Sequence, residues 1–282
     1  MLKILLVLNL VFIHLAFADV YPDTVHQRRE LTTEEKQHLL HLGKLGQSGC
    51  SASALTPDTI LTAEHCFPRY LNGASDRSLI NGYLESNPSH TFKIISVLDA
   101  SSHYSNDVLV LKIKWTSGKA PADLKYTREI VIHESDLKFG ADSEATSLFT
   151  IGYPKDRDRQ ATHSTGFLKD TDLIPGAVAM KDPYTLKPLA DALYLKVNVP
   201  MTHGNSGGAV FTGNYKLVGT VHGGSTALES EKNSAEFNSQ GSRFWNRIAA
   251  LYYVYPQMKS LQKIFPNGIN PNVGENGEWI GK

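Results

Sequence analysis

Short apolar runs recur along the chain between turn-forming residues, beginning after Gly49. In the first half they are Ser51–Leu55, Thr59–Thr62, Phe92–Leu98 and Val108–Ile113. After a polar connector around residues 114–143, a second series follows: Ser147–Gly152, Ser164–Leu168, Ala192–Val199, Ala209–Phe211 and Lys216–His222. Short runs of this kind, bounded by Gly, Pro, Asn and Asp, are typical of antiparallel strands. By itself the pattern predicts an all-β barrel or sandwich.

Two segments have helical patterns instead. Residues 31–43 read as a helix that Thr32 caps with Glu35 three positions on, and that Gly43 ends. Near the end of the chain, apolar residues at helical spacing before Pro256 predict a C-terminal helix on the second strand series: Phe244, Ile248, Leu251, Tyr252 and Tyr255. A C-terminal tail follows over residues 256–282, and from Pro266, where it is rich in Gly and Asn, we expect it to be loosely held.

Residues 1–18 have the pattern of a signal peptide. Lys3 precedes an apolar run too short to span a bilayer comfortably, and Ala16-Phe17-Ala18 resembles a cleavage site. We expect a mature chain from Asp19 that is secreted, or periplasmic in a bacterium; an uncleaved anchor is the alternative. Residues 19–47 form a leader that is either retained or removed as a propeptide. Arg28-Arg29 is either a processing site or an ordinary surface pair.

The composition is that of a globular protein: 282 residues, 41% hydrophobic and 20% charged, with a formal net charge of zero. This balance, without a Lys/Arg cluster, argues against nucleic acid or a membrane surface as a partner. The sequence has no H-E-x-x-H motif, so we expect no metal and no cofactor. We expect a monomer.

The segment from Thr202 to Phe211 holds the strongest chemical signal. Ser206 lies between glycines just before an apolar run. A serine hydroxyl becomes a good nucleophile only when a base takes its proton and donors stabilise the oxyanion. Gly204 would let its own N–H and that of Ser206 point into one small space. The alternative is an ordinary glycine-flanked turn.

Two further segments supply the other groups that a serine nucleophile needs. Ile60–Cys66 is a strand-like run that ends in His65 beside a cysteine, and Asp107 begins the apolar run 108–113. The order His65, Asp107, Ser206 is that of chymotrypsin-type serine proteases, whereas unrelated triad folds use other orders.

The three segments together resemble the motifs of the chymotrypsin-fold serine protease family. Thr62–Cys66 matches its T-A-x-H-C motif, Asn106–Ile113 its N-D-[IV]-A-L strand and Gly204–Gly208 its G-[DN]-S-G-G loop. The resemblance covers roughly residues 44–255. It implies two packed six-stranded antiparallel β-barrels with a C-terminal helix. The protease domain would span 48–255, with one barrel at about 48–125 and the other at about 140–255.

The resemblance also assigns roles. Ser206 would attack a peptide carbonyl, His65 would act as general base and acid, and Asp107 would orient the imidazole. Backbone N–H groups of Gly204 and Ser206 would form the oxyanion hole. Cys50 and Cys66 fall where the family has the disulfide beside its catalytic histidine. The function implied is a secreted endopeptidase acting on proteins or peptides. The alternatives are a catalytically silent homologue that binds a partner, and an esterase with the same triad.

Several residues depart from the family's usual pattern. Asn205 stands where pancreatic-type enzymes have the Asp that pairs with a new N-terminus, which points to the glutamyl-endopeptidase-like branch. Phe149–Pro154, followed by Thr165-Gly166, resembles that branch as well. Glu64 replaces the usual Ala or Gly before the histidine, and we expect its side chain to point into solvent.

The pocket that selects the substrate side chain is expected to be lined by Met201, Thr202, Val221, His222 and Gly224. Pro200 replaces the acidic residue of trypsin-like enzymes, which argues against a preference for Arg or Lys. His222 lies one position beyond the histidine with which glutamyl endopeptidases contact an acidic side chain. A preference for Glu or Asp is therefore open, and medium apolar side chains are favoured because Met201 and Val221 are apolar.

Overall fold

The computed structural model describes residues 28–43, 49–66, 81–101, 106–140, 144–154, 160–174, 192–199, 201, 204–224 and 246–281. The predicted signal peptide and its cleavage site lie outside these residues. Within them, no helix combines the length and the apolar character that a membrane span requires.

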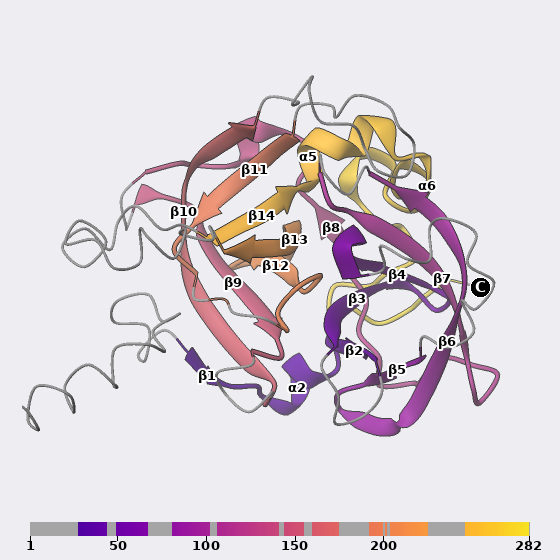
Figure 1. Ribbon diagram of the computed structural model, residues 1–282. Coiled ribbons are helices and arrows are strands. Elements are labelled where there is room, and N and C mark those ends of the chain that lie inside the picture. Colours follow the sequence, from indigo (N-terminus) through magenta and orange to yellow (C-terminus); the bar gives the residue numbers. More distant parts are fainter. Residues whose placement is uncertain are drawn as a thin grey trace, which may run out of the picture.

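The described strands form two closed antiparallel barrels of six strands each, which lie side by side in Figure 1. The first barrel contains β2 (Leu40–Leu42), β3 (Cys50–Thr56), β4 (Thr59–Thr62), β5 (Asn81–Leu84), β6 (Asn87–Ala100) and β7 (Leu109–Trp115). The second contains β9 (Ser147–Gly152), β10 (Thr162–Ile174), β11 (Ala192–Val197), β12 (Ala209–Thr212), β13 (Lys216–Gly224) and β14 (Asn246–Ala250). The predicted fold class is confirmed.

The two barrels share one strand order. Around the first barrel the neighbours run β2-β3-β4-β7-β6-β5, and β5 pairs back with β2. Around the second they run β9-β10-β11-β14-β13-β12, and β12 pairs back with β9. In each barrel the last strand thus pairs with the third. Closure leaves neither barrel with a free sheet edge, except where short strands β1 (Arg28–Glu30) and β8 (Glu129–Ile130) add to the second.

Successive side chains on a strand face opposite sides, and in β4 and at the start of β7 both sides are buried. In β4, Ile60 belongs to the core of the first barrel, whereas Leu61 packs in a cluster shared by residues of both barrels. In β7, Leu109 faces the barrel core and Val110 the shared cluster. Both faces are buried along β4 and at the start of β7, so exposed polar residues are missing there, whereas farther along β7 Lys112 and Lys114 are exposed.

The N-terminal segment differs from its helical prediction. Thr32 and Glu35 do form a capping box, but helix α2 covers only Thr33–Lys36. The chain then enters β2, whose residues are all buried between β3 and β5. Consecutive burial on a strand outweighs the helical spacing of the leucines. The first barrel therefore begins at Leu40, before the predicted start of the protease domain at residue 48.

A charged cluster ties this segment to the second barrel. β1 pairs with β10, with Arg29 opposite His163. The Arg29 guanidinium donates two hydrogen bonds of 2.6 Å to the Glu35 carboxylate. His163 Nδ1 lies 2.7 Å from the same carboxylate, and its ring stacks on Phe149. Arg29 is thus held in place within a paired strand.

The C-terminal helix is present, but it begins later than its apolar spacing suggests. Ile248 lies in β14, which is buried between β11 and β13, and the helical turns follow as α5 (Leu251–Val254) and α6 (Lys259–Ile264). Short 3-10 turns lie at Glu64–Cys66 (η2), Glu134–Asp136 (η4), Tyr255–Gln257 (η7) and Pro266–Gly268 (η8).

The residues after Pro266 pack on the first barrel instead of forming a loose tail. Asn270 is buried and its side-chain amide donates a 2.9 Å hydrogen bond to the carbonyl of Leu55. Trp279 packs against the first barrel's core, with its ring centroid 5.5 Å from that of Tyr126. The apolar side chains scattered among the glycines supply this anchoring.

Candidate functional site

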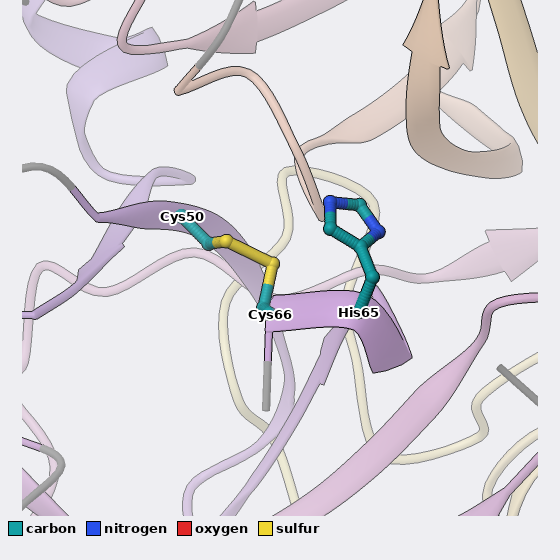
Figure 2. Close-up of side chains that lie close together, drawn as sticks. All are labelled: Cys50, His65 and Cys66. Atoms are coloured by element: carbon teal, nitrogen blue, oxygen red, sulfur yellow. A yellow bond between two sulfur atoms is a disulfide. The ribbon is translucent and has the colours of Figure 1, made fainter. Parts of the chain in front are cut away.

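His65 lies on η2, which follows β4 directly and is tied down by a disulfide (Figure 2). The bond joins Cys50, at the start of β3, to Cys66, with a Cα–Cα distance of 6.2 Å. The predicted disulfide is confirmed. Because the crosslink is adjacent to His65, it restrains the turn that carries the imidazole.

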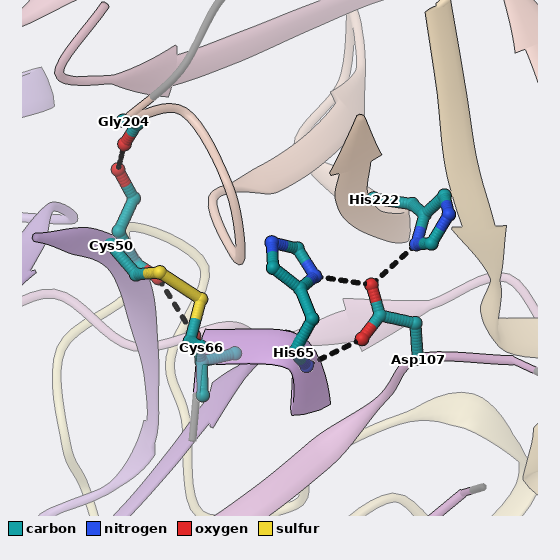
Figure 3. Close-up of a disulfide and its surroundings, with 8 residues drawn as sticks. Cys50, His65, Cys66, Asp107, Gly204 and His222 are labelled. Atoms are coloured by element: carbon teal, nitrogen blue, oxygen red, sulfur yellow. Dashed lines mark hydrogen bonds and ion pairs between the residues drawn. A yellow bond between two sulfur atoms is a disulfide. The ribbon is translucent and has the colours of Figure 1, made fainter. Parts of the chain in front are cut away.

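Asp107 lies two residues before the start of β7 and is completely buried. One carboxylate oxygen, Oδ1, accepts a 2.7 Å hydrogen bond from the backbone N–H of His65. The other, Oδ2, lies 2.6 Å from His65 Nδ1 and 2.5 Å from His222 Nδ1 (Figure 3). Asp107 adopts a left-handed backbone conformation with φ of 52°, which short polar residues tolerate.

These contacts keep the buried carboxyl group ionised. Burial alone would raise the pKa of Asp107, but the hydrogen bonds from His222 and His65 outweigh it and lower the pKa. An ionised carboxylate accepts hydrogen bonds and donates none, so the proton of each imidazole is on Nδ1. The lone pair of His65 is therefore on Nε2, on the far side of the ring from Asp107.

Ser206 lies in the loop between the described residue Met201 and β12, and two hydrogen bonds from Ser51 hold that loop on β3. The Ser51 N–H donates to the carbonyl of Ser206 over 2.8 Å, and the Ser51 hydroxyl donates to the carbonyl of Gly204 over 3.0 Å. Gly204 has φ of +99°, a conformation that glycine adopts readily. Within the described part of the chain, the hydroxyl of Ser206 makes no hydrogen bond.

Gly207 brings the Ser206 loop against the chain just before His65. Its φ is +75°, and a Cβ there would lie 2.1 Å from Thr62 Oγ1 and 2.8 Å from the N atom of Ala63. The N–H of Gly207 also donates to the carbonyl of Val221. The loop therefore touches both the segment before His65 and the strand that carries His222.

His222 has a different partner from the one the sequence predicted. The pairing of β13 with β14 shifts register between Val221 and Gly223, which marks a bulge at His222. The imidazole contacts Asp107 and stacks on Tyr194 with ring centroids 4.4 Å apart. Counting along the sequence could not reveal this contact, because it depends on where the strand bulges.

The other predicted pocket residues are only partly placed. Met201 and Val221 are 4% and 1% exposed and belong to the core of the second barrel. Gly224 ends β13, and Thr202 and Pro200 lie outside the described residues.

Two polar residues near the site are buried. Glu64, which the sequence placed in solvent, is 2% exposed. Asn205 is completely buried, and among the described residues its side-chain amide has no hydrogen-bond partner.

The sequence model of the trypsin-like peptidase domain matches residues 50–219, a range that includes His65, Asp107 and Ser206 but ends before His222. No curated protein matches the chain. One similar solved structure is the inactive form of a serine-to-alanine mutant of Rv3671c from M. tuberculosis H37Rv, at 16% identity, with 79% of this chain and 85% of that chain covered and a TM-score of 0.48. Another is the inactive form of the Rv3671c protease, at 17% identity, with 79% and 87% covered and a TM-score of 0.48.

Proposed function

The chain belongs to the trypsin-like peptidase domain family, and on this premise we propose that it is a secreted serine endopeptidase. Its substrates are proteins or peptides. The contact between His65 Nδ1 and Asp107 Oδ2, at 2.6 Å, carries the proposal. It fixes the neutral imidazole in the tautomer whose Nε2 can accept a proton.

The reaction proceeds through an acyl-enzyme. Ser206 Oγ attacks the peptide carbonyl while His65 Nε2 takes its proton, and the protonated imidazole then delivers that proton to the leaving amine. Asp107 holds the ring and stabilises its charged form. In enzymes without substrate, catalytic hydrogen bonds are often long and tighten on binding, which accommodates a Ser206 hydroxyl without a hydrogen bond among the described residues.

The oxyanion that forms on the carbonyl is stabilised by backbone N–H groups of Gly204 and Ser206. The two hydrogen bonds from Ser51 hold the carbonyls of these residues, so the loop is fixed before substrate arrives. Such preorganised donors contribute most when they need not reorient during the reaction.

For the side chain before the cut bond, we favour medium apolar groups over Glu or Asp. His222 is the one predicted pocket residue that could carry a positive charge, and Asp107 engages its Nδ1. The likeness to the glutamyl-endopeptidase-like branch then rests on Asn205 and on Phe149–Pro154, and it does not extend to substrate preference.

We further propose that residues 28–43 stay in the mature enzyme and that the cleavage that releases it lies upstream. β2 completes the first barrel, and Arg29 is bonded to Glu35 within a paired strand. A cut after Arg29 would separate these groups. The unmodified mass of the secreted protein tests this directly.

A fluorophosphonate probe followed by mass spectrometry tests the reaction. We expect one adduct on Ser206, absent in Ser206→Ala and retained in Ser89→Ala, a matched change on the exposed part of β6. A folded protein without an adduct would indicate a silent homologue that binds a partner. An adduct together with ester hydrolysis but no peptide cleavage would indicate an esterase.

A further inference from the structure

Asp107 serves two imidazoles, and the proposed hydrolysis uses only one of them. The Nδ1 atoms of His65 and His222 lie 2.6 Å and 2.5 Å from the same oxygen, Oδ2. The ring centroids are 5.9 Å apart and the ring planes are nearly perpendicular, at 89°. The two nitrogens therefore converge on the carboxylate from different directions (Figure 3).

Two imidazoles and a carboxylate are a donor set that zinc prefers. One ligand atom from each of His65, Asp107 and His222 lies within 4.8 Å of the other two. Zn–N and Zn–O bonds of about 2.0–2.2 Å would place tetrahedral ligand atoms about 3.3 Å apart. The two short contacts to Oδ2 would each have to open by less than about 1 Å, which a small ring rotation supplies.

We propose that His65, Asp107 and His222 form a binding site for a divalent transition-metal ion, with Zn²⁺ as the test ion, and that binding switches the enzyme off. The loss of activity rests on the proposed hydrolysis, whereas the binding does not. The sequence predicted no metal site, because Asp107 is 42 residues from His65 and 115 from His222.

The inhibition follows from the proton positions. A metal bound to Nδ1 takes the lone pair there, so a neutral imidazole must carry its proton on Nε2 instead. The number of protons on each ring is unchanged, but His65 Nε2 can no longer accept the proton of Ser206. Asp107 is already ionised and releases no proton.

Both imidazole rings are partly exposed to solvent, so an ion could approach the site past them. Asp107 is fully buried, but the side chains of His65 and His222 are 27% and 29% exposed. Stacking on Tyr194 limits the movement of the His222 ring. Imidazole ligands suit Zn²⁺, Cu²⁺ and Ni²⁺, whereas Mg²⁺ and Ca²⁺ prefer oxygen, so we expect the first three ions to bind and the last two not to.

Calorimetric titration of the Ser206→Ala protein with Zn²⁺ tests the binding without any catalysis. We expect one equivalent to bind, and affinity at least about tenfold weaker after His222→Gln. His133→Gln, a change of an exposed histidine before η4, is the matched control and should leave the affinity unchanged. Equal affinities in the His222→Gln and parent proteins would overturn the site, as would no binding by the parent.

A second variant and a second measurement distinguish the loss of a metal ligand from a loss of folding in His222→Gln. His222→Ser, checked by its thermal unfolding, should lose affinity in the same way. Co²⁺ as a substitute ion should give the parent protein a visible absorption band of a nitrogen-bound tetrahedral ion, which both variants lose. A band that persists in both folded variants would exclude His222 as a ligand.

The enzyme with Ser206 intact tests whether metal binding inhibits hydrolysis. Zn²⁺ should abolish peptide cleavage and fluorophosphonate labelling, and a chelator should restore both. His222→Gln should need at least about tenfold more Zn²⁺ for half inhibition. Full activity at a Zn²⁺ concentration that saturates the site would refute the switch. Zn²⁺ binding through His222 in a protein that never labels would refute the hydrolysis and leave the metal site standing.

Discussion

The backbone N–H of Ser51 donates a 2.8 Å hydrogen bond to the backbone carbonyl of Ser206, which joins a strand of the first barrel to a loop of the second. Ser51 follows Cys50, whose disulfide partner Cys66 follows His65. One strand end thus holds both the proposed nucleophile loop and the proposed base. We call this contact between Ser51 and the Ser206 loop the junction, and a change that disturbs it should affect catalysis more than overall folding.

Gly207→Ala tests how closely the loop must approach the first barrel. A Cβ would lie 2.1 Å from Thr62 Oγ1 and 2.6 Å from the carbonyl oxygen of Ser51, on a residue with φ of +75°. We expect kcat/KM for a fluorogenic peptide to fall by at least about 100-fold, because small misplacements of reacting groups have effects of this size. Gly213→Ala, where a Cβ meets nothing within 4 Å, should have little effect. Similar kinetics for the two variants would contradict this role of the junction.

Replacing both cysteines by serine tests the disulfide. The crosslink spans 16 residues of sequence. On the chain-entropy model its loss should lower the free energy of unfolding by about 3 kcal/mol. Urea unfolding of the oxidised parent, the reduced parent and the double variant measures the change. The reduced parent should match the variant, and three equal midpoints would count against the prediction.

Asp107→Asn tests the orienting role of the carboxylate. An amide cannot accept from both imidazoles as the carboxylate does, so His65 loses the constraint on its tautomer. We expect kcat to fall by about 10⁴-fold, as in the corresponding change in the Ser-His-Asp template, with little change in KM. Steady-state kinetics supply the measurement. A fall in kcat below about tenfold would mean that Asp107 does not orient the base.

Asn205→Asp tests the departure from pancreatic-type enzymes. Asn205 is completely buried and has no hydrogen-bond partner among the described residues, so an ionised carboxylate there would be unpaired. We expect a loss of about 3–5 kcal/mol of stability, seen as a lower thermal midpoint. Asn87→Asp, at an exposed position on β6, should change the midpoint little. An undiminished midpoint in Asn205→Asp would show that a counter-charge reaches this position.

His38 should make the protein less stable in acid. Burial, together with the charge of Lys125, lowers the pKa of His38 from 6.5 to about 4. The unfolded chain therefore binds more protons between these values, and stability that is complete above pH 6.5 is lost as the pH falls towards 4. The loss is on the order of 3 kcal/mol. Unfolding midpoints at several pH values should show a flatter dependence in His38→Gln, and an identical slope would contradict the assignment.

The sequence could predict the barrel strands whose apolar runs stand between clear turn signals, as at residues 108–113. It could not predict β2 or β14, because their leucine and isoleucine spacings also fit a helix. Both become strands because strand partners lie on either side and bury all of β2 and all of β14 except Arg247. β5 was missed for another reason: Gly82 is a poor strand former, yet the absence of a Cβ makes room for Phe92.

The sequence predicts the residues of the candidate site that lie within recognisable motifs, but not the contacts that depend on tertiary structure. His65, Asp107 and Ser206 were recognisable from the residues around them, and the structure brings the first two into contact. The shared use of Asp107 by His222 could not be foreseen, because a bulge in β13 decides where that imidazole points. The burial of Glu64 likewise depends on tertiary packing.

Each barrel is partly covered by the opposite end of the chain. β1 precedes the first barrel but pairs with the second, and Asn270 follows the second barrel but bonds to Leu55 in the first. A polypeptide that emerges from its N-terminus, during synthesis or export, can therefore close the strands of its first barrel early, but it gains the contact from Asn270 only after the second barrel's strands have emerged. We expect the proposed hydrolase to acquire its working shape late, so that the cell that makes it is exposed to little of its activity beforehand.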